Sequence, residues 1–147
     1  MKVKDLMTQK PACATPDMDL SKVAKLMDEH KVGSIPVVEN KDNLKVVGVV
    51  TDRDIATRAV AQGKNPLQMK AMDIMSSPVV LVKPDDDVQD VAQLMQKHMV
   101  RRVPVIDEAG KICGMVAQAD IALKASDQTT VGVVQSVSKP TQKSSKV

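Results

Sequence analysis

Apolar residues recur with helical spacing in two separate stretches of the chain. In each stretch they stand at positions i, i+3, i+4 and i+7, which places them on one face of an α-helix. The two sets are Leu20, Val23, Ala24 and Met27, and Val88, Val91, Ala92 and Met95. Asp19 and Asp87 stand directly before them, where a carboxylate can accept hydrogen bonds from free helix amides. The pattern predicts two amphipathic helices, each with one buried face.

Shorter apolar runs, typical of strands, surround each predicted helix. An extended stretch precedes the helix and ends at a Pro-Asp turn, and two strands joined by a polar turn follow it. A last helix begins directly after the third strand. The predicted elements are strands at 12–15, 35–38 and 45–50 with a helix at 52–61, and strands at 79–82, 103–106 and 111–116 with a helix at 118–125.

The two halves are copies of one unit. The matching stretches are residues 5–7 and 73–75, 35–38 and 103–106, and 48–55 and 114–121. A repeat of this kind decides the fold class. We predict an α+β fold of two tandem β-α-β-β-α motifs related by pseudo-twofold symmetry, because a small sheet covered on one face leaves apolar area that a second copy can cover.

The repeat also predicts the domain organisation. The first motif occupies residues 1–62 and the second occupies residues 72–127. Residues 63–71 form a connector, since Gly63 and Pro66 interrupt helices. Residues 128–147 are expected to form a short helix and a disordered, solvated tail.

Composition narrows the classes of function. The chain has 147 residues, 43% of them hydrophobic, with ten Met and no aromatic residue. Base-stacking platforms are therefore missing, and the net charge of +3 is spread along the chain, so a nucleic-acid binder is disfavoured. No apolar run is long enough for a membrane span or a signal peptide. Cys13 and Cys113 are expected to be buried free thiols of a cytoplasmic protein.

Candidate chemistry lies where the third strand of the first repeat meets its last helix. Thr51 ends the strand and Asp54 lies in the first helical turn, so its carboxylate can point at a ligand above the helix N-terminus. A carboxylate suits a ribose diol, and free helix amides suit a phosphate. Arg53 and Arg58 could add positive charge. Thr-x-x-Asp is also the pattern of an ordinary helix cap, and that alternative stays open.

The second repeat keeps part of this pattern. Asp120 stands at the place of Asp54, whereas Ala117 replaces the hydroxyl residue. Arg101 and Arg102 stand where the first repeat has uncharged residues. They either supply cations to a shared cleft or extend their charged ends into solvent.

These stretches resemble the CBS motif, the small domain named after cystathionine β-synthase, and the tandem pair resembles a Bateman module. The resemblance covers residues 1 to about 127. It implies a ligand containing adenosine, with AMP, ADP or ATP first and NAD or S-adenosylmethionine as further candidates, bound in clefts between the motifs. It also implies a homodimer. The binding residues that it implies are Ile35, Pro36, Val37, Thr51, Arg53, Asp54, Arg101, Arg102, Val103, Pro104, Val105 and Asp120.

We therefore expect a regulatory module without catalytic activity that senses adenosine nucleotides and acts, if at all, on a separate effector protein. The alternative is a structural or protein-interaction dimerisation module with vestigial clefts, which Ala117 favours and the intact Thr51-x-x-Asp54 opposes. An enzyme is the least supported class, since no acid/base pair is indicated. His30 and His98 lack the further ligands that a metal would need, so no metal site is predicted.

Overall fold

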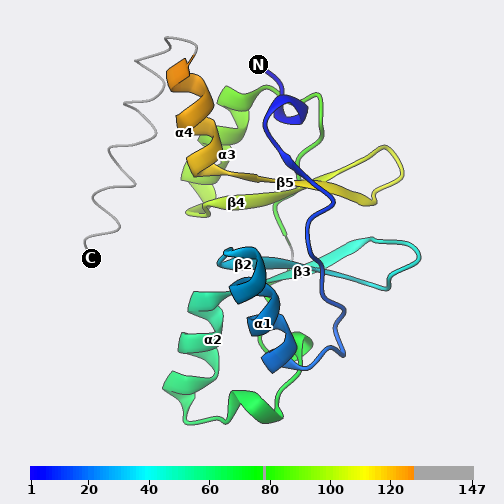
Figure 1. The fold of residues 1–147 in the computed structure, drawn as a ribbon, viewed down its shortest axis with the longest axis vertical. Coiled ribbons are helices and arrows are strands. Elements are labelled where there is room, and N and C mark those ends of the chain that lie inside the picture. The colour runs from blue at the N-terminus through cyan, green and yellow to red at the C-terminus, as the bar shows by residue number, and fades with distance from the viewer. Residues whose placement is uncertain (78, 128–147) are drawn as a thin grey trace. The chain divides into compact units, whose positions relative to one another are not determined.

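The computed structural model describes residues 1–77 and 79–127 (Figure 1), with side chains up to residue 124. The chain divides into two compact units. Unit 1 gathers Met1–Gln9, Val80–Ile106 and Gly114–Val147, and unit 2 gathers Lys10–Val79 and Asp107–Cys113. The short helix and the tail predicted for residues 128–147 lie outside the described residues. None of the described helices is long and apolar enough to cross a membrane.

Unit 2 holds the first repeat around a small antiparallel sheet. Its elements are α1 (Leu20–His30), β2 (Ser34–Val38), β3 (Val46–Thr51) and α2 (Asp52–Arg58), followed by the 3-10 turns η2 (Val60–Gln62), η3 (Pro66–Gln68) and η4 (Ala71–Asp73). β2 pairs with β3. The predicted first strand is reduced to one parallel bridge, between Ala14 and Val37. The predicted helix at 52–61 ends as an α-helix at Arg58 and continues as the turn η2.

Unit 1 repeats this arrangement around the second repeat. Its elements are η1 (Val3–Asp5), β1 (Thr8–Gln9), α3 (Val88–His98), β4 (Arg102–Ile106), α4 (Gln118–Asp127) and, from Gly114 onward, β5 (Ile112–Ala117). The strand order is β1-β5-β4, and Val82 forms a parallel bridge with Val105. The α+β fold class is thus confirmed.

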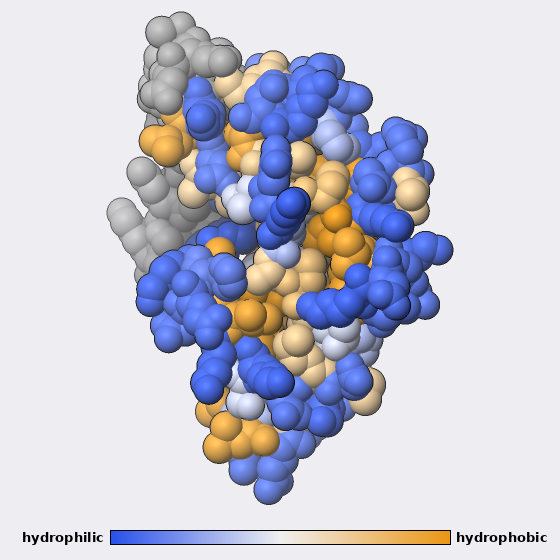
Figure 2. Space-filling view, turned by 45° about the vertical axis from the view of Figure 1, so that its right-hand side comes forward, coloured by the Kyte–Doolittle hydropathy of each residue, from blue (hydrophilic) through white to orange (hydrophobic). Residues whose placement is uncertain are grey.

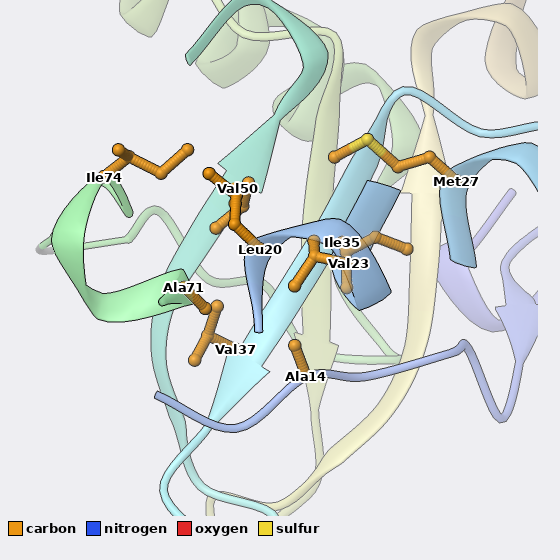
Figure 3. Packing of buried hydrophobic residues seen from close by; sticks show 9 residues of the cluster. All are labelled: Ala14, Leu20, Val23, Met27, Ile35, Val37, Val50, Ala71 and Ile74. Atoms are coloured by element: carbon orange, nitrogen blue, oxygen red, sulfur yellow. The ribbon is translucent and has the colours of Figure 1, made fainter. Parts of the chain in front are cut away.

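The core of unit 2 lies between α1 and the sheet. Figure 3 shows its side chains converging from α1, from both strands and from the turn η4. The buried cluster consists of Ala14, Leu20, Val23, Met27, Ile35, Val37, Val50, Ala71 and Ile74. The predicted helix face is therefore correct at Leu20, Val23 and Met27 and wrong at Ala24, which is exposed. Burying such aliphatic groups contributes roughly 1.5–3 kcal/mol for each large side chain.

The first residues of each repeat pack in the unit of the other repeat. Residues 1–9 lie in unit 1, where the Val3 N–H donates to the Asp86 carbonyl at 3.0 Å. In unit 2 the Ala71 N–H donates to the Met18 carbonyl at 2.9 Å, and Ser76 pairs with Val49 at the sheet edge. The compact units are consequently discontinuous in sequence, whereas the predicted boundaries follow the repeats.

This exchange explains the two matching triplets of the repeat, Asp5-Leu6-Met7 and Asp73-Ile74-Met75. Each methionine covers a glycine of the third strand. A Cβ placed on Gly48 would lie 2.7 Å from Met75 Sδ and 3.0 Å from its Cγ. A Cβ on Gly114 would lie 3.1 Å from both Met7 Cγ and the Thr8 carbonyl oxygen. The glycines are needed because the methionines lie directly on the strand.

Gly48→Ala is expected to lower the free energy of unfolding by about 1–3 kcal/mol, since overpacking forces the neighbouring side chain and backbone to move. Urea denaturation measures the loss. In a Met75→Ala background the same substitution is expected to cost less, because Sδ and Cγ are gone. Equal costs in the two backgrounds would contradict this contact.

The surface is mainly hydrophilic on the face shown in Figure 2, with hydrophobic groups exposed between the polar ones. The exposed large hydrophobic residues of the described chain are Met1, Val60, Leu67, Met72, Leu81, Met99 and Leu123. They belong to both units.

Candidate functional site

Thr51 and Asp54 form a reciprocal helix cap at the junction of β3 and α2. Thr51 Oγ1 accepts the Asp54 N–H at 3.0 Å, and Asp54 Oδ2 accepts the Thr51 N–H at 3.0 Å. This capping box satisfies two backbone donors that the helix itself leaves unpaired. The interpretation of Thr-x-x-Asp as a cap is therefore confirmed. The second carboxylate oxygen of Asp54 lies outside the cap.

Arg58 lies against this second oxygen, Oδ1. Its Nε is 3.7 Å from Asp54 Oδ1, and its Nη1 donates to the Ile74 carbonyl at 2.9 Å. The Asp54 side chain is 13% exposed and that of Arg58 is 48% exposed. Arg58 was predicted to add charge for a phosphate, but the structure shows it holding Asp54 and the segment after η4. Arg53, by contrast, is exposed on α2.

The strand residues predicted to line a cleft are buried. Ile35 and Val37 belong to the core cluster, so both are engaged in packing beneath α1. Because side chains alternate along a strand, Pro36 faces the opposite side of the sheet. In the second repeat Val103, Pro104 and Val105 are likewise buried.

Asp120 has a different environment from Asp54. It lies in the first turn of α4, half-buried, and within the described part of the chain its carboxylate has neither a hydrogen bond nor an ion pair. Ala117 offers no hydroxyl for a cap. The junction is otherwise equivalent, since the Gln118 N–H donates to the Arg101 carbonyl at 2.8 Å. Arg101 is exposed and Arg102 is half-buried at the start of β4. Asp120 is therefore more available than Asp54 as an acceptor for a ligand.

A shallow hollow of about 280 Å³ opens in unit 2 at the N-terminus of α1. It is lined by Thr15, Asp17, Met18, Asp19, Lys22 and Lys70. Lys70 Nζ donates to Asp19 Oδ1 at 2.6 Å, which lowers the pKa of the Asp19 carboxyl and raises that of Lys70. Asp19 consequently makes no side-chain cap to α1, whereas Asp87 accepts the Gln89 N–H as predicted. None of the predicted binding residues lines this hollow.

The two cysteines are free thiols with little tendency to ionise. Burial raises the pKa of both, and for Cys113 the neighbouring Asp107 raises it further. Within the described residues, no group of three or more His, Cys, Asp or Glu side chains could hold a metal ion. The thiols are therefore protonated at neutral pH.

The chain belongs to the CBS domain family. The family model matches it twice, over residues 3–61 and 71–127. The CBS domain-containing protein YhcV of Bacillus subtilis is 39% identical over 130 residues, which is 88% of this chain and 89% of that protein. Hypoxic response protein 1 of Mycobacterium tuberculosis is 31% identical over 137 residues, or 93% of this chain and 94% of that protein. The predicted family is confirmed.

Solved structures of CBS pairs show ligands containing adenosine. The CBS domain pair of protein MJ0100, in complex with 5'-methylthioadenosine and S-adenosyl-L-methionine, has a TM-score of 0.78 and 29% identity, covering 88% of this chain and 98% of that chain. CBSX2 in complex with AMP has a TM-score of 0.71 and 26% identity, and the match covers 86% of this chain and 96% of that chain. CBSX2 comes from Arabidopsis thaliana.

Relatives named as enzymes match in only part of their length. L-aspartate semialdehyde sulfurtransferase of Methanocaldococcus jannaschii is 32% identical over 120 residues, which is 82% of this chain but 22% of that protein. The matching part of such a protein is a CBS pair. CBS pairs are in general regulatory rather than catalytic, so the similarity carries no catalytic residue to this chain.

Proposed function

We propose that this protein is a regulatory module that binds a ligand containing adenosine, with AMP, ADP or ATP as the first candidates and S-adenosylmethionine or NAD as others. The observation that carries the proposal is the acid in the first turn of the helix after the third strand, present in both repeats as Asp54 and Asp120. A carboxylate there can accept both hydroxyls of a ribose. The adenosine ligands of similar CBS pairs support the choice of ligand.

The two acids are not equivalent acceptors. One carboxylate oxygen of Asp54 already accepts the Thr51 N–H, and the other lies beside Arg58. Asp120 has all its acceptor positions available within the described residues, and Arg102 stands on the neighbouring strand β4. We assign the ribose contact of the tighter site to Asp120 and that of the weaker site to Asp54. Thr51 and Arg53 are assigned to the anionic group of a ligand at the first repeat, and Arg101 to the anionic group of a ligand at the second repeat.

The remaining binding residues of the proposal contribute apolar contact. They are Ile35, Pro36, Val37, Val103, Pro104 and Val105. Self-association into a homodimer is part of the same proposal, and exposed apolar side chains such as Val60, Leu67 and Leu123 support it. The ligand would act by binding one of two conformations of the protein more tightly than the other. An effector protein on a separate chain would respond to the conformation that the ligand favours.

Isothermal titration of the protein with AMP tests the proposal. Asp120→Asn is expected to weaken AMP binding by about 1–3 kcal/mol, because it removes a charged acceptor. Asp54→Asn is expected to have a smaller effect on affinity and to lower the melting temperature through the cap. Asp42→Asn, a matched change at an exposed turn position, serves as the control. Failure of the wild-type protein to bind AMP, ATP, NAD or S-adenosylmethionine would favour the alternative of a dimerisation module with vestigial clefts.

A further inference from the structure

We propose that Arg58 is a positioning residue that couples ligand binding at Asp54 to the segment 71–76. A ligand bound at the first repeat would then make this segment open less often. The inference rests on the proposed function. It goes further in assigning a role to one side chain and a response to one segment.

The first step is the contact geometry of Arg58. One guanidinium makes both contacts, with Nε 3.7 Å from Asp54 Oδ1 and Nη1 donating to the Ile74 carbonyl at 2.9 Å. A guanidinium is planar and rigid, so its two contacts cannot be adjusted independently. Asp54 is itself fixed through Oδ2 by the Thr51 N–H at 3.0 Å. The position of Oδ1 is thereby tied to the position of the Ile74 carbonyl.

The second step is the place of the segment 71–76 in unit 2. Ala71 and Ile74 are buried in the core, Met75 covers Gly48, and Ser76 pairs with Val49 through hydrogen bonds of 2.9 and 3.1 Å. Ser76 thus forms an isolated antiparallel bridge with Val49 of β3, the strand that ends at Thr51. Stability is not uniform across a fold, and a segment held to a sheet by a single bridge is expected to open more easily than the paired strands. One added hydrogen bond there has a measurable effect.

The third step is the contrast with the second repeat. Lys124 stands at the position of Arg58 and is exposed, and Leu6 stands at the position of Ile74. A lysine has no fork that could hold two acceptors in fixed geometry. Within the described residues no hydrogen bond or ion pair joins the Lys124 side chain to the segment 3–8. The link is therefore a property of the first repeat, and residues 3–8 provide an internal control in the same molecule.

The direction of the effect follows from how the ligand would hold Asp54. A carboxylate oxygen has more than one lone pair, so a ligand hydroxyl can donate to Asp54 Oδ1 without displacing Arg58, although less strongly than to an acid with no such neighbour. The hydroxyl then restricts the carboxylate to its present orientation, which favours the bound position of Arg58 and the bond to Ile74. If the ligand stabilises this segment, then the segment's order must increase the affinity for the ligand by the same factor.

Hydrogen exchange of the full chain, with and without saturating AMP, tests the inference. AMP is expected to slow exchange of the Ser76 amide several-fold and to leave residues 3–8 unchanged. In Arg58→Gln without ligand, exchange at Ser76 is expected to be about five-fold faster, the factor that one net hydrogen bond supplies. The AMP-dependent slowing should be lost in this variant although AMP still binds. Arg58→Lys should restore it only in part, and Lys64→Gln, which removes an exposed cation from unit 2, should behave as wild type.

The outcomes separate the two proposals. Wild-type protein that binds no AMP in the calorimeter would overturn the proposed function and this inference with it. AMP binding without slowing at Ser76, with equal slowing at residues 3–8, or with undiminished slowing in Arg58→Gln would overturn the inference alone.

Discussion

Deleting residues 1–9 is expected to unfold unit 1, although in sequence these residues belong to the first repeat. The deletion removes Val3 and Leu6, which are 0% and 8% exposed, and the β1 pairing of Thr8 with Met115. Two large apolar side chains contribute roughly 3–6 kcal/mol at about 1.5–3 kcal/mol each. A domain has only about 5–15 kcal/mol of stability in total.

Circular dichroism in a urea titration measures this loss. The truncated chain should show an early transition that the intact chain lacks, while unit 2 unfolds later, because its own edge segment 71–76 is retained. Lys4→Ala is the control: the Lys4–Asp85 ion pair is exposed on both sides and should add little. A truncated chain with the urea midpoint of the intact chain would contradict the exchange of segments.

Leu20→Ala is expected to lower the free energy of unfolding by about 2–5 kcal/mol, the usual cost of removing a buried leucine and leaving a cavity. Leu20 is 1% exposed at the start of α1. It joins the helix to the exchanged segment as well as to the sheet, since it shares the buried cluster with Ala71 and Ile74. Its N–H also donates to the Met69 carbonyl at 2.9 Å, which holds the backbone in place and limits collapse of the cavity.

The chain offers a matched control for this substitution. Leu67 is 74% exposed in the turn η3, so Leu67→Ala removes the same atoms from a site that is largely in water. The urea midpoint should fall much further in Leu20→Ala than in Leu67→Ala. Similar losses at both positions would show that α1 does not close the core as described.

The elements with strong periodicity could be predicted from the sequence. The helix faces at Leu20, Val23 and Met27, the strand at Ile35, and the cap at Asp87 are all present. Each depends on neighbours within one turn or one strand, and such local information is contained in the spacing of residues.

What the sequence did not predict depends on contacts between distant residues. Asp19 makes no side-chain cap because Lys70, far along the chain, takes its carboxylate. The role of Met75 depends on the closeness of Gly48, and the role of Arg58 depends on the Ile74 carbonyl. The repeated Asp-Leu-Met and Asp-Ile-Met triplets were a signal for this exchange, but a repeat does not tell which copy its segments pack against.

In the predicted site, too, the local features could be predicted and the contacts between distant residues could not. Thr51 and Asp54 could be placed at a helix start because the motif is local. The difference between a capped Asp54 and an uncapped Asp120 follows from Ala117, which the sequence displays, and from Arg58, whose position requires the fold. The assignment of the tighter site to the second repeat is the result of that comparison.

A crystal structure of the protein grown with AMP tests the central claim most directly. The account predicts AMP with its ribose hydroxyls within hydrogen-bonding distance of the Asp120 carboxylate, and at higher AMP concentration also of Asp54. AMP bound elsewhere, for example in the hollow beside Asp19 and Lys70, with both acids free of contact to the ribose, would contradict it.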